Sequence, residues 1–129
     1  MKFTFTFITW LLFAMSSFAQ VITVANTQNF SYCYENYEDT SLIYQSNNGS
    51  PLRINFTSGS FEEDYDLITI IDGNGSGTVL LEEYSGSLSG LNFIASSGVI
   101  TILINSDGSF SCADEDQETL EYTISVISC

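Results

Sequence analysis

Histidine is absent from this 129-residue chain, and only two basic residues, Lys2 and Arg53, stand against sixteen Asp and Glu residues. Without histidine the chain cannot build a Ser-His-Asp triad, a Cys-His pair or an imidazole ligand for a metal. The net charge of −14 excludes nucleic acid and anionic lipid as partners, because binding to phosphates needs several Lys or Arg side chains. Carboxylate chemistry remains: hard-cation binding or an acid–base pair.

No apolar run is long enough to cross a bilayer. The longest, residues 7–15 (FITWLLFAM), falls well short of the ~20 residues that a membrane-spanning helix needs. A positively charged start at Lys2 precedes it, and Ser17 and Ala19 place small residues at positions −3 and −1 of a cut before Gln20. We therefore interpret residues 1–19 as a signal peptide and residues 20–129 as one secreted, extracellular domain without membrane insertion. Its net charge would be −15, with Arg53 as the sole base.

Cysteine is scarce, and its number is odd. Cys33, Cys112 and Cys129 all follow the leader, so they would enter a compartment where disulfides persist. One disulfide and one free thiol are expected, and the residues leave three pairings open, including one between Cys129 and an early strand. We favour Cys33–Cys112, because closing so long a loop would constrain the unfolded chain by ~4 kcal/mol. The spacings contain no CxxC, so a zinc site is not expected.

Proline occurs only once, as Pro51, and no segment has apolar residues at helical spacing. Short β-branched or aromatic segments alternate instead with clusters of Gly, Ser, Asn and Asp, which are turn-forming residues. This spacing predicts two packed antiparallel sheets, an all-β sandwich. The expected strands are residues 21–26, 41–44, 52–56, 66–72, 78–83, 91–95, 99–105 and 119–127.

Two of the expected strands indicate which way their side chains face. Residues 52–56 alternate apolar and polar side chains, so Ile54 should point into the core while Arg53 and Asn55 face solvent. Residues 99–104 are all apolar except Thr101. That segment is therefore expected to be a central strand covered on both sides.

Two motifs in these strands and turns resemble those of the CUB domain, an extracellular β-sandwich. The first is YDLITIIDG at residues 65–73, which follows Phe56 and an acidic turn, and the second is INSDGS at residues 104–109. The resemblance spans roughly residues 33–129 and implies a jelly-roll-like sandwich within a longer multidomain protein. Asp64 stands where family members usually have a cysteine, so the usual two-disulfide pattern is absent and no pairing for Cys33 can be carried over.

The resemblance also implies a calcium site. The matching ligands would be Glu62 or Glu63, Asp66, Asp107 and the main-chain carbonyl of Ser109. Calcium takes six to eight oxygen ligands in flexible geometry, so a set of carboxylates and a carbonyl suits it.

The alternative is that these acids are ordinary turn residues. Residues 62–64 would then form a solvated charged turn, and Asp107 would initiate a turn before Gly108. We favour calcium, because clustered like charges repel one another without a cation. A second acidic cluster at residues 114–118 lacks the spacing of a helix-loop-helix calcium site, and we interpret it as a solvated loop rather than a further calcium loop.

Two classes of function remain after these exclusions. The resemblance implies a non-enzymatic binding or adhesion module, in which calcium orders one end of the sandwich and the loops there recognise an extracellular protein or glycan. The alternatives are a carboxylate hydrolase such as a glycosidase, which needs two facing carboxyls across a cleft, and a metal-free structural surface domain. No residue pattern marks a catalytic pair, so the module is the favoured prediction and no catalytic residue is assigned.

Overall fold

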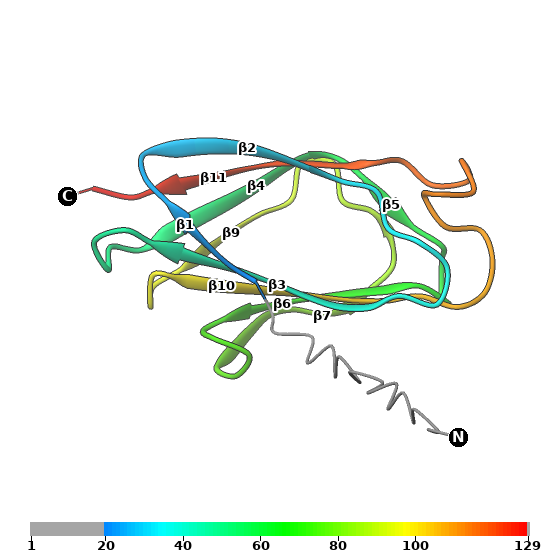
Figure 1. Cartoon of the computed structure of the whole chain (residues 1–129), viewed down its shortest axis with the longest axis horizontal. Helices are drawn as coiled ribbons and strands as arrows, with labels where there is room; N and C mark the ends of the chain where they lie inside the picture. Colours follow the sequence, from blue (N-terminus) through cyan, green and yellow to red (C-terminus); the bar gives the residue numbers. More distant parts are fainter. Residues whose placement is uncertain (1–19, 129) are drawn as a thin grey trace, which may run out of the picture.

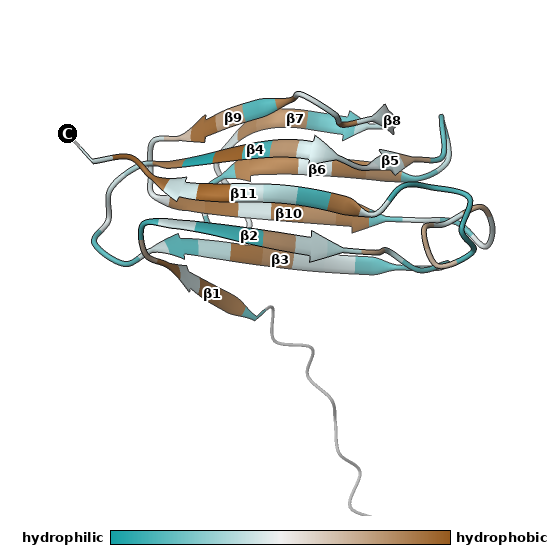
Figure 2. Ribbon diagram, turned by 90° about the horizontal axis from the view of Figure 1, so that it is seen from above, coloured by the Kyte–Doolittle hydropathy of each residue, from teal (hydrophilic) through white to brown (hydrophobic). Residues whose placement is uncertain are grey.

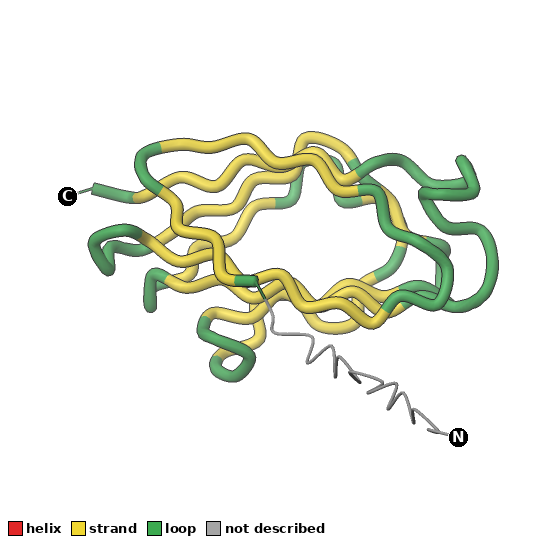
Figure 3. The backbone as a smooth tube through the Cα atoms, in the orientation of Figure 1, coloured by secondary structure: helices red, strands yellow, loops and turns green. Residues whose placement is uncertain are grey.

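The computed structural model describes residues 20–128, so the interpretation of residues 1–19 as a signal peptide and the role of Cys129 lie outside the described residues. All regular structure in the described part of the chain is strand (Figure 3). The strands are β1 (Val21–Val24), β2 (Thr27–Tyr32), β3 (Asp39–Ser46), β4 (Leu52–Ser58), β5 (Ser60–Phe61), β6 (Leu67–Asp72), β7 (Thr78–Tyr84), β8 (Gly86–Ser87), β9 (Asn92–Ala95), β10 (Val99–Asn105) and β11 (Leu120–Val126).

Two sheets face each other and confirm the predicted sandwich (Figure 1). One has five strands in the order β1-β3-β10-β6-β7, and the other has four in the order β2-β11-β4-β9. Strands β5 and β8 form a small separate pair. All pairings are antiparallel except that of β1 with β3. Within residues 20–128 no helix is long and apolar enough to cross a membrane.

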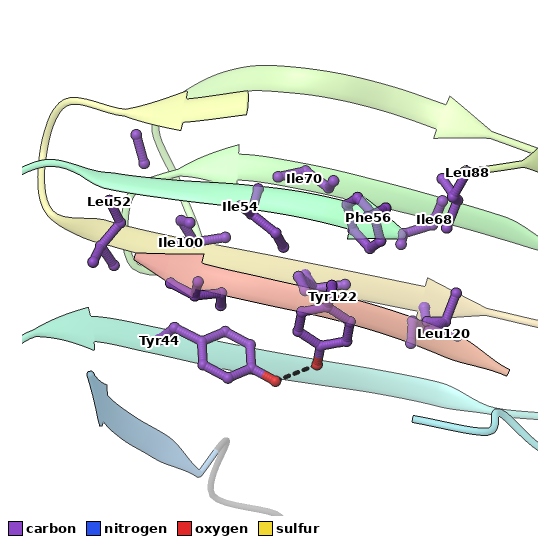
Figure 4. Packing of buried hydrophobic residues seen from close by; sticks show 14 of the residues in the cluster. Tyr44, Leu52, Ile54, Phe56, Ile68, Ile70, Leu88, Ile100, Leu120 and Tyr122 are labelled. Atoms are coloured by element: carbon purple, nitrogen blue, oxygen red, sulfur yellow. Dashed lines mark hydrogen bonds between the residues drawn. The ribbon is translucent and has the colours of Figure 1, made fainter. Parts of the chain in front are cut away.

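Alternating side chains build the core between the sheets. In β4, Leu52, Ile54 and Phe56 are buried whereas Arg53 and Asn55 are exposed, as predicted. The hydropathy of the ribbon alternates along the paired strands in the same way (Figure 2). Aliphatic side chains from both sheets meet in the interior, and burial of this apolar surface is the main stabilising contribution to the fold (Figure 4).

Strand β10 occupies the central position that its composition predicts, between β3 and β6. Ile100, Ile102 and Ile104 point into the core. On the outer face Thr101 is fully buried, because its Oγ1 donates to the carbonyl of Gly73 at 2.6 Å and accepts from the amide of Gly75 at 2.9 Å. The turn after β6 therefore covers one part of this outer face, and Leu103 is left half-buried.

One expected strand ends early, and a second strand that was not expected follows it. The segment 21–26 continues only to Val24 as β1, and a turn at Asn26, with φ at 60°, leads into β2 in the other sheet. Strand β2 was not predicted, because its inward side chains include only two large apolar residues, Phe30 and Tyr32. The two-residue strands β5 and β8 are too short for any periodicity to reveal.

Two tyrosine hydroxyls meet within the core. Tyr44 of β3 and Tyr122 of β11 hydrogen-bond to each other through their hydroxyls, so the bond links the two sheets (Figure 4). Phe30 lies beside both rings, with ring centroids 4.8 Å from Tyr44 and 5.7 Å from Tyr122. Burial raises the pKa of both hydroxyls, so the pair stays neutral.

Candidate metal centre

Three connections gather at one end of the sandwich, on the right in Figure 1: residues 33–38, 62–66 and 106–119. A disulfide between Cys33 and Cys112, with Cα atoms 5.2 Å apart, joins the first to the third and confirms the favoured pairing. Backbone hydrogen bonds also join these two connections. The amide of Ala113 donates to the carbonyl of Tyr34 at 3.0 Å, and the amide of Tyr37 donates to the carbonyl of Asp107 at 2.8 Å. The loops are thus held in a fixed arrangement.

Among the acidic residues at this end of the molecule, Asp66 is fully buried. Its Oδ2 accepts a hydrogen bond of 2.6 Å from the Tyr34 hydroxyl, and its Oδ1 accepts one of 2.9 Å from the backbone amide of Asp107. The Tyr34 ring stacks on Phe61 with centroids 4.5 Å apart. Burial and the bond to Asp66 raise the pKa of Tyr34, which keeps its hydroxyl protonated as a donor.

Glu62 lies beside Asp66 because the chain turns tightly between them. The amides of Tyr65 and Asp66 both donate to the Glu62 carbonyl, at 3.2 and 3.0 Å. Oxygen Oε2 of Glu62 is buried and has no hydrogen-bond partner. The pKa of Glu62 is raised, mainly by desolvation and to a smaller extent by repulsion from Asp107 and Asp66. Within the described residues, no protein donor therefore compensates the charge at Oε2 of Glu62.

Glu62, Asp66 and Asp107 form what we call the carboxylate cluster, since one oxygen from each lies within 4.8 Å of the others. Oxygen ligands bind calcium at about 2.4 Å, so ligands on opposite sides of one ion lie about 4.8 Å apart. The spacing therefore suits three ligands of a single ion. Arg53, the sole basic residue among residues 20–128, lies on β4 with an exposed side chain. Within that range no side-chain cation sits among the clustered charges.

The two remaining residues of the expected site, Glu63 and Ser109, contribute no carboxylate to this cluster. Glu63 is exposed and does not belong to the group, so of the two neighbouring glutamates the structure brings Glu62 to the site. The amide of Ser109 donates to Oδ1 of Asp107 at 3.2 Å and helps to hold that carboxylate. The role of the Ser109 carbonyl as a ligand stays a prediction.

The second acidic cluster borders the first more closely than the sequence indicates. Asp114, Glu115, Asp116 and Glu118 are all exposed, as expected of a solvated loop. Asp116 is nevertheless close enough to Glu62 that its charge contributes to the raised pKa of Glu62. Any cation at the carboxylate cluster would therefore also feel the field of this loop.

Three exposed aromatic side chains lie on the same three connections as the carboxylate cluster: Tyr37, Tyr65 and Phe110, with exposed fractions of 82%, 64% and 53%. Tyr37 and Phe110 adopt positive φ values of 55° and 60°, which bulky residues rarely do. The ring of Tyr37 lies against Gly108, where an added Cβ would collide with the Tyr37 hydroxyl. Exposed aromatics and strained backbone of this kind are typical of binding surfaces.

Tyr34 was not foreseen as part of the site. It lies 32 residues before Asp66, and no motif links the two positions. The exposure of the three aromatic side chains was not predicted either, because composition does not show which aromatic residues are exposed.

The cluster does not resemble a catalytic cleft. Asp66 is fully buried and accepts hydrogen bonds from the protein at both oxygens, so it does not face a second carboxyl across an open cleft as a glycosidase pair does. Two surface cavities, of about 350 and 390 Å³, are lined by other residues. One lies over Arg53 and Asn55 of the four-stranded sheet, and the other lies over the five-stranded sheet.

Comparisons with known proteins find similarity in structure alone. Neither a family model nor a curated protein matches the sequence. The structure of the MASP-1 CUB2 domain bound to Ca²⁺ superposes with a TM-score of 0.65 at 19% identity, covering 82% of this chain and 96% of that one. The CUB1-EGF-CUB2 region of human MASP-1/3 gives 0.64 at 17% identity, covering 84% of this chain.

The full extracellular region of zebrafish Gpr126/Adgrg6 also gives a TM-score of 0.64, at 20% identity and 85% coverage of this chain. This chain spans 41% of the MASP-1/3 chain and 15% of the zebrafish one. At these identities the similarity establishes the fold. The protein has the fold of a CUB domain, an all-β jelly-roll sandwich.

Proposed function

We propose that the protein is a secreted, calcium-dependent binding module, in which one calcium ion orders the loops that recognise an extracellular protein or glycan. The carboxylate cluster carries the proposal: three carboxylates lie within 4.8 Å of one another, and buried Oε2 of Glu62 has no partner. An ion at this point would complete the coordination of Glu62 and offset the repulsion among the three charges.

The ion would have a structural role. Glu62 and Asp66 lie in the connection before β6, and Asp107 follows β10, so a shared ion would link two loops to each other. The aromatic residues Tyr37, Tyr65 and Phe110 would then be presented on a rigid base, and rigid aromatic side chains supply much of the energy of protein and glycan recognition. The calcium-bound state of the MASP-1 CUB2 domain, which has the same fold, supports this assignment.

In this proposal the protein is exported and acts as an interaction module rather than as an enzyme. The disulfide Cys33–Cys112 is consistent with an oxidising compartment, and the similar folds occur in multidomain extracellular proteins. Removal of residues 1–19 would yield a secreted chain that begins at Gln20. Mass spectrometry of the exported protein tests this directly, and material that still carries Met1 would contradict it.

Calorimetric titration of the purified protein with calcium tests the site. We expect one ion per chain, and Glu62→Gln should weaken binding about tenfold to a hundredfold, since it removes a charged ligand. This variant suits the test because Oε2 of Glu62 has no protein partner to lose. Glu115→Gln, which removes an equal charge from the exposed loop, is the matched control and should change the affinity by less than about threefold.

Absence of heat in the wild type would refute the proposal. Equal weakening by the two variants would show that calcium responds only to the net charge of this end of the molecule, and it would also refute the assigned ligands.

A further inference from the structure

The outer face of the four-stranded sheet is polar along its two central strands, although Ile94 of the edge strand β9 is exposed on it. On the four-stranded sheet the outward side chains of β4 and β11 are small or polar, for example Asn55, Thr57 and Thr123. On the five-stranded sheet the outer face includes two leucines, Leu67 and Leu103, which are half-buried and do not belong to the core between the sheets. Apolar side chains on a solvent-facing sheet surface favour contact with a partner.

These leucines lie in a cavity of about 390 Å³, which we call the outer cavity. The backbone register places its lining on four adjacent strands, with Asn105 of β10 opposite Asp39 of β3 on one side and opposite Leu67 of β6 on the other. Leu103 is opposite Thr69 one step further along. The volume falls at the lower end of the range for ligand sites, which suits side chains of a peptide segment.

Carboxylates stand at both sides of the outer cavity. Asp39 lies on β3 and Glu83 on β7, with β10 and β6 between them. Adjacent strands are 4.7–4.9 Å apart, so the two backbones lie about 14 Å from each other. Arg53, the one basic residue within residues 20–128, belongs to the opposite sheet, so no described cation neutralises these charges.

Glu83 lines the outer cavity at a place where the pairing of β6 with β7 is irregular. The register of β6 against β7 shifts on both sides of Ile70, and Glu83 adopts a positive φ of 41°. Its backbone amide donates to Oγ1 of Thr69 at 3.1 Å, which holds the distorted strand in place. Bulges re-aim side chains, and backbone strain of this kind clusters at binding sites.

We propose that the outer cavity binds a lysine-containing segment of a protein partner, with the methylene stems over Leu67 and Leu103 and the ammonium groups at Asp39 and Glu83. Lysine stems bury readily along apolar surface while the charged head stays hydrated. In an extended segment, residues i and i+4 face the same way about 14 Å apart, which matches the separation of the two carboxylate-bearing strands. An anionic partner would be repelled.

The inference shares with the proposed function only the premise of a protein partner. The outer cavity contains no residue of the carboxylate cluster, so the lysine-containing segment should bind in chelator as well as in calcium. Failure of the calcium site would therefore leave this proposal standing, and the reverse also holds.

The test is an NMR titration of the full chain in chelator with two capped peptides of equal composition, Lys-Ser-Gly-Ser-Lys and Ser-Lys-Lys-Gly-Ser. We expect the first to bind more tightly and to shift the backbone amides of Leu67, Thr69, Leu103 and Asn105. The double variant D39N/E83Q should weaken its binding about tenfold.

The matched control, E115Q/E118Q, removes two charges from the exposed loop at residues 114–118 and should change the affinity by less than about twofold. Equal weakening by the two double variants, or equal affinity for the two peptides, would overturn the proposal, because either result means that lysine is attracted only by the overall charge. Shifts centred on Glu62 and Asp107 would overturn it as well.

Discussion

The hydroxyl of Tyr34 donates a 2.6 Å hydrogen bond to Oδ2 of Asp66, and the two residues come from segments 32 positions apart. Asp66 is fully buried, so its carboxylate depends on this bond and on the amide of Asp107 for compensation. The Tyr34 ring is fixed in turn by stacking on Phe61. Tyr34 is therefore a positioning residue for the carboxylate cluster rather than a ligand of the proposed ion.

Replacing Tyr34 by Phe should cost about 1–3 kcal/mol of unfolding free energy in chelator, because it leaves a buried carboxylate oxygen unpaired. Urea denaturation measures the loss. Tyr84→Phe is the matched control, since its hydroxyl donates to the carbonyl of Ser87 at an exposed position and should cost about 1 kcal/mol or less. A Tyr34 variant no less stable than the control would contradict the positioning role.

The paired hydroxyls of Tyr44 and Tyr122 predict a non-additive result. Each single Tyr→Phe change strands the other hydroxyl in the core and should cost about 1–3 kcal/mol, whereas the double change removes both polar groups and should cost clearly less than the sum. A double-mutant cycle by chemical denaturation measures the difference. Additive losses would mean that the two hydroxyls do not stabilise each other.

The strands that could be predicted are those whose side chains alternate or are apolar throughout. In β4 the apolar residues Leu52, Ile54 and Phe56 alternate with polar ones and predict the buried face. In β10 the aliphatic run predicts a central place in the sheet. Strand β2 was missed because it lies at the edge of its sheet and packs only one face, where Gln28 takes one of the inward positions. The change of sheet at Asn26 depends on a backbone angle that no periodicity reveals.

The candidate site divides in a similar way. Asp66 and Asp107 could be predicted because short motifs carry them, and the choice between Glu62 and Glu63 could not, since adjacent residues in a turn point in different directions. The structure groups Glu62, and not Glu63, with the other two carboxylates, while the role of Glu62 as a ligand stays a prediction. The nearness of Asp116 to Glu62 depends on how the loop after Cys112 folds back, which the local sequence does not encode.

Asp72 makes a pH-dependent contribution to stability at the opposite end of the sandwich. Desolvation opposes its ionisation, but hydrogen bonds from the amides and hydroxyls of Ser96 and Ser97 prevail and lower the pKa of Asp72 below 3.8. A lowered pKa in the folded state stabilises the protein above pH 3.8 and ceases to do so as the pH falls through the folded value.

Asp72→Asn should therefore cost about 1 kcal/mol at neutral pH, and the difference from wild type should shrink in acid. Denaturant unfolding at a series of pH values measures both effects. Glu82→Gln, at an exposed position of β7, should leave the pH profile close to that of the wild type. A constant difference between Asp72→Asn and wild type at all pH values would contradict the assigned linkage.

The disulfide Cys33–Cys112 closes a separation of 79 residues. Replacing both cysteines by serine should lower the unfolding free energy by about 4 kcal/mol, since it restores the conformational freedom of that loop in the unfolded chain. Denaturation under oxidising conditions measures the loss, and thiol titration of unfolded wild-type protein should find one free cysteine per chain. Three reactive thiols in exported protein would contradict the pairing.

Calcium should stabilise the folded protein by mass action, because the carboxylate cluster is assembled only in the folded state. At a hundred times the dissociation constant the gain should be about 2.7 kcal/mol, which for a domain of this size raises the melting temperature by about 10 °C. Magnesium should give a smaller rise at equal concentration, because it requires tight octahedral geometry and retains its water.

Thermal denaturation in calcium, magnesium and chelator measures these shifts. Asp107→Asn should abolish most of the rise in calcium, since it removes one of the three charged ligands, whereas Glu115→Gln should preserve it. Asp107→Asn keeps the backbone amide that bonds to Asp66, so its loss of response would report on the ion rather than on a broken fold. An equal melting temperature in calcium and in chelator would mean that the cluster binds no ion, and the domain would then be a metal-free sandwich.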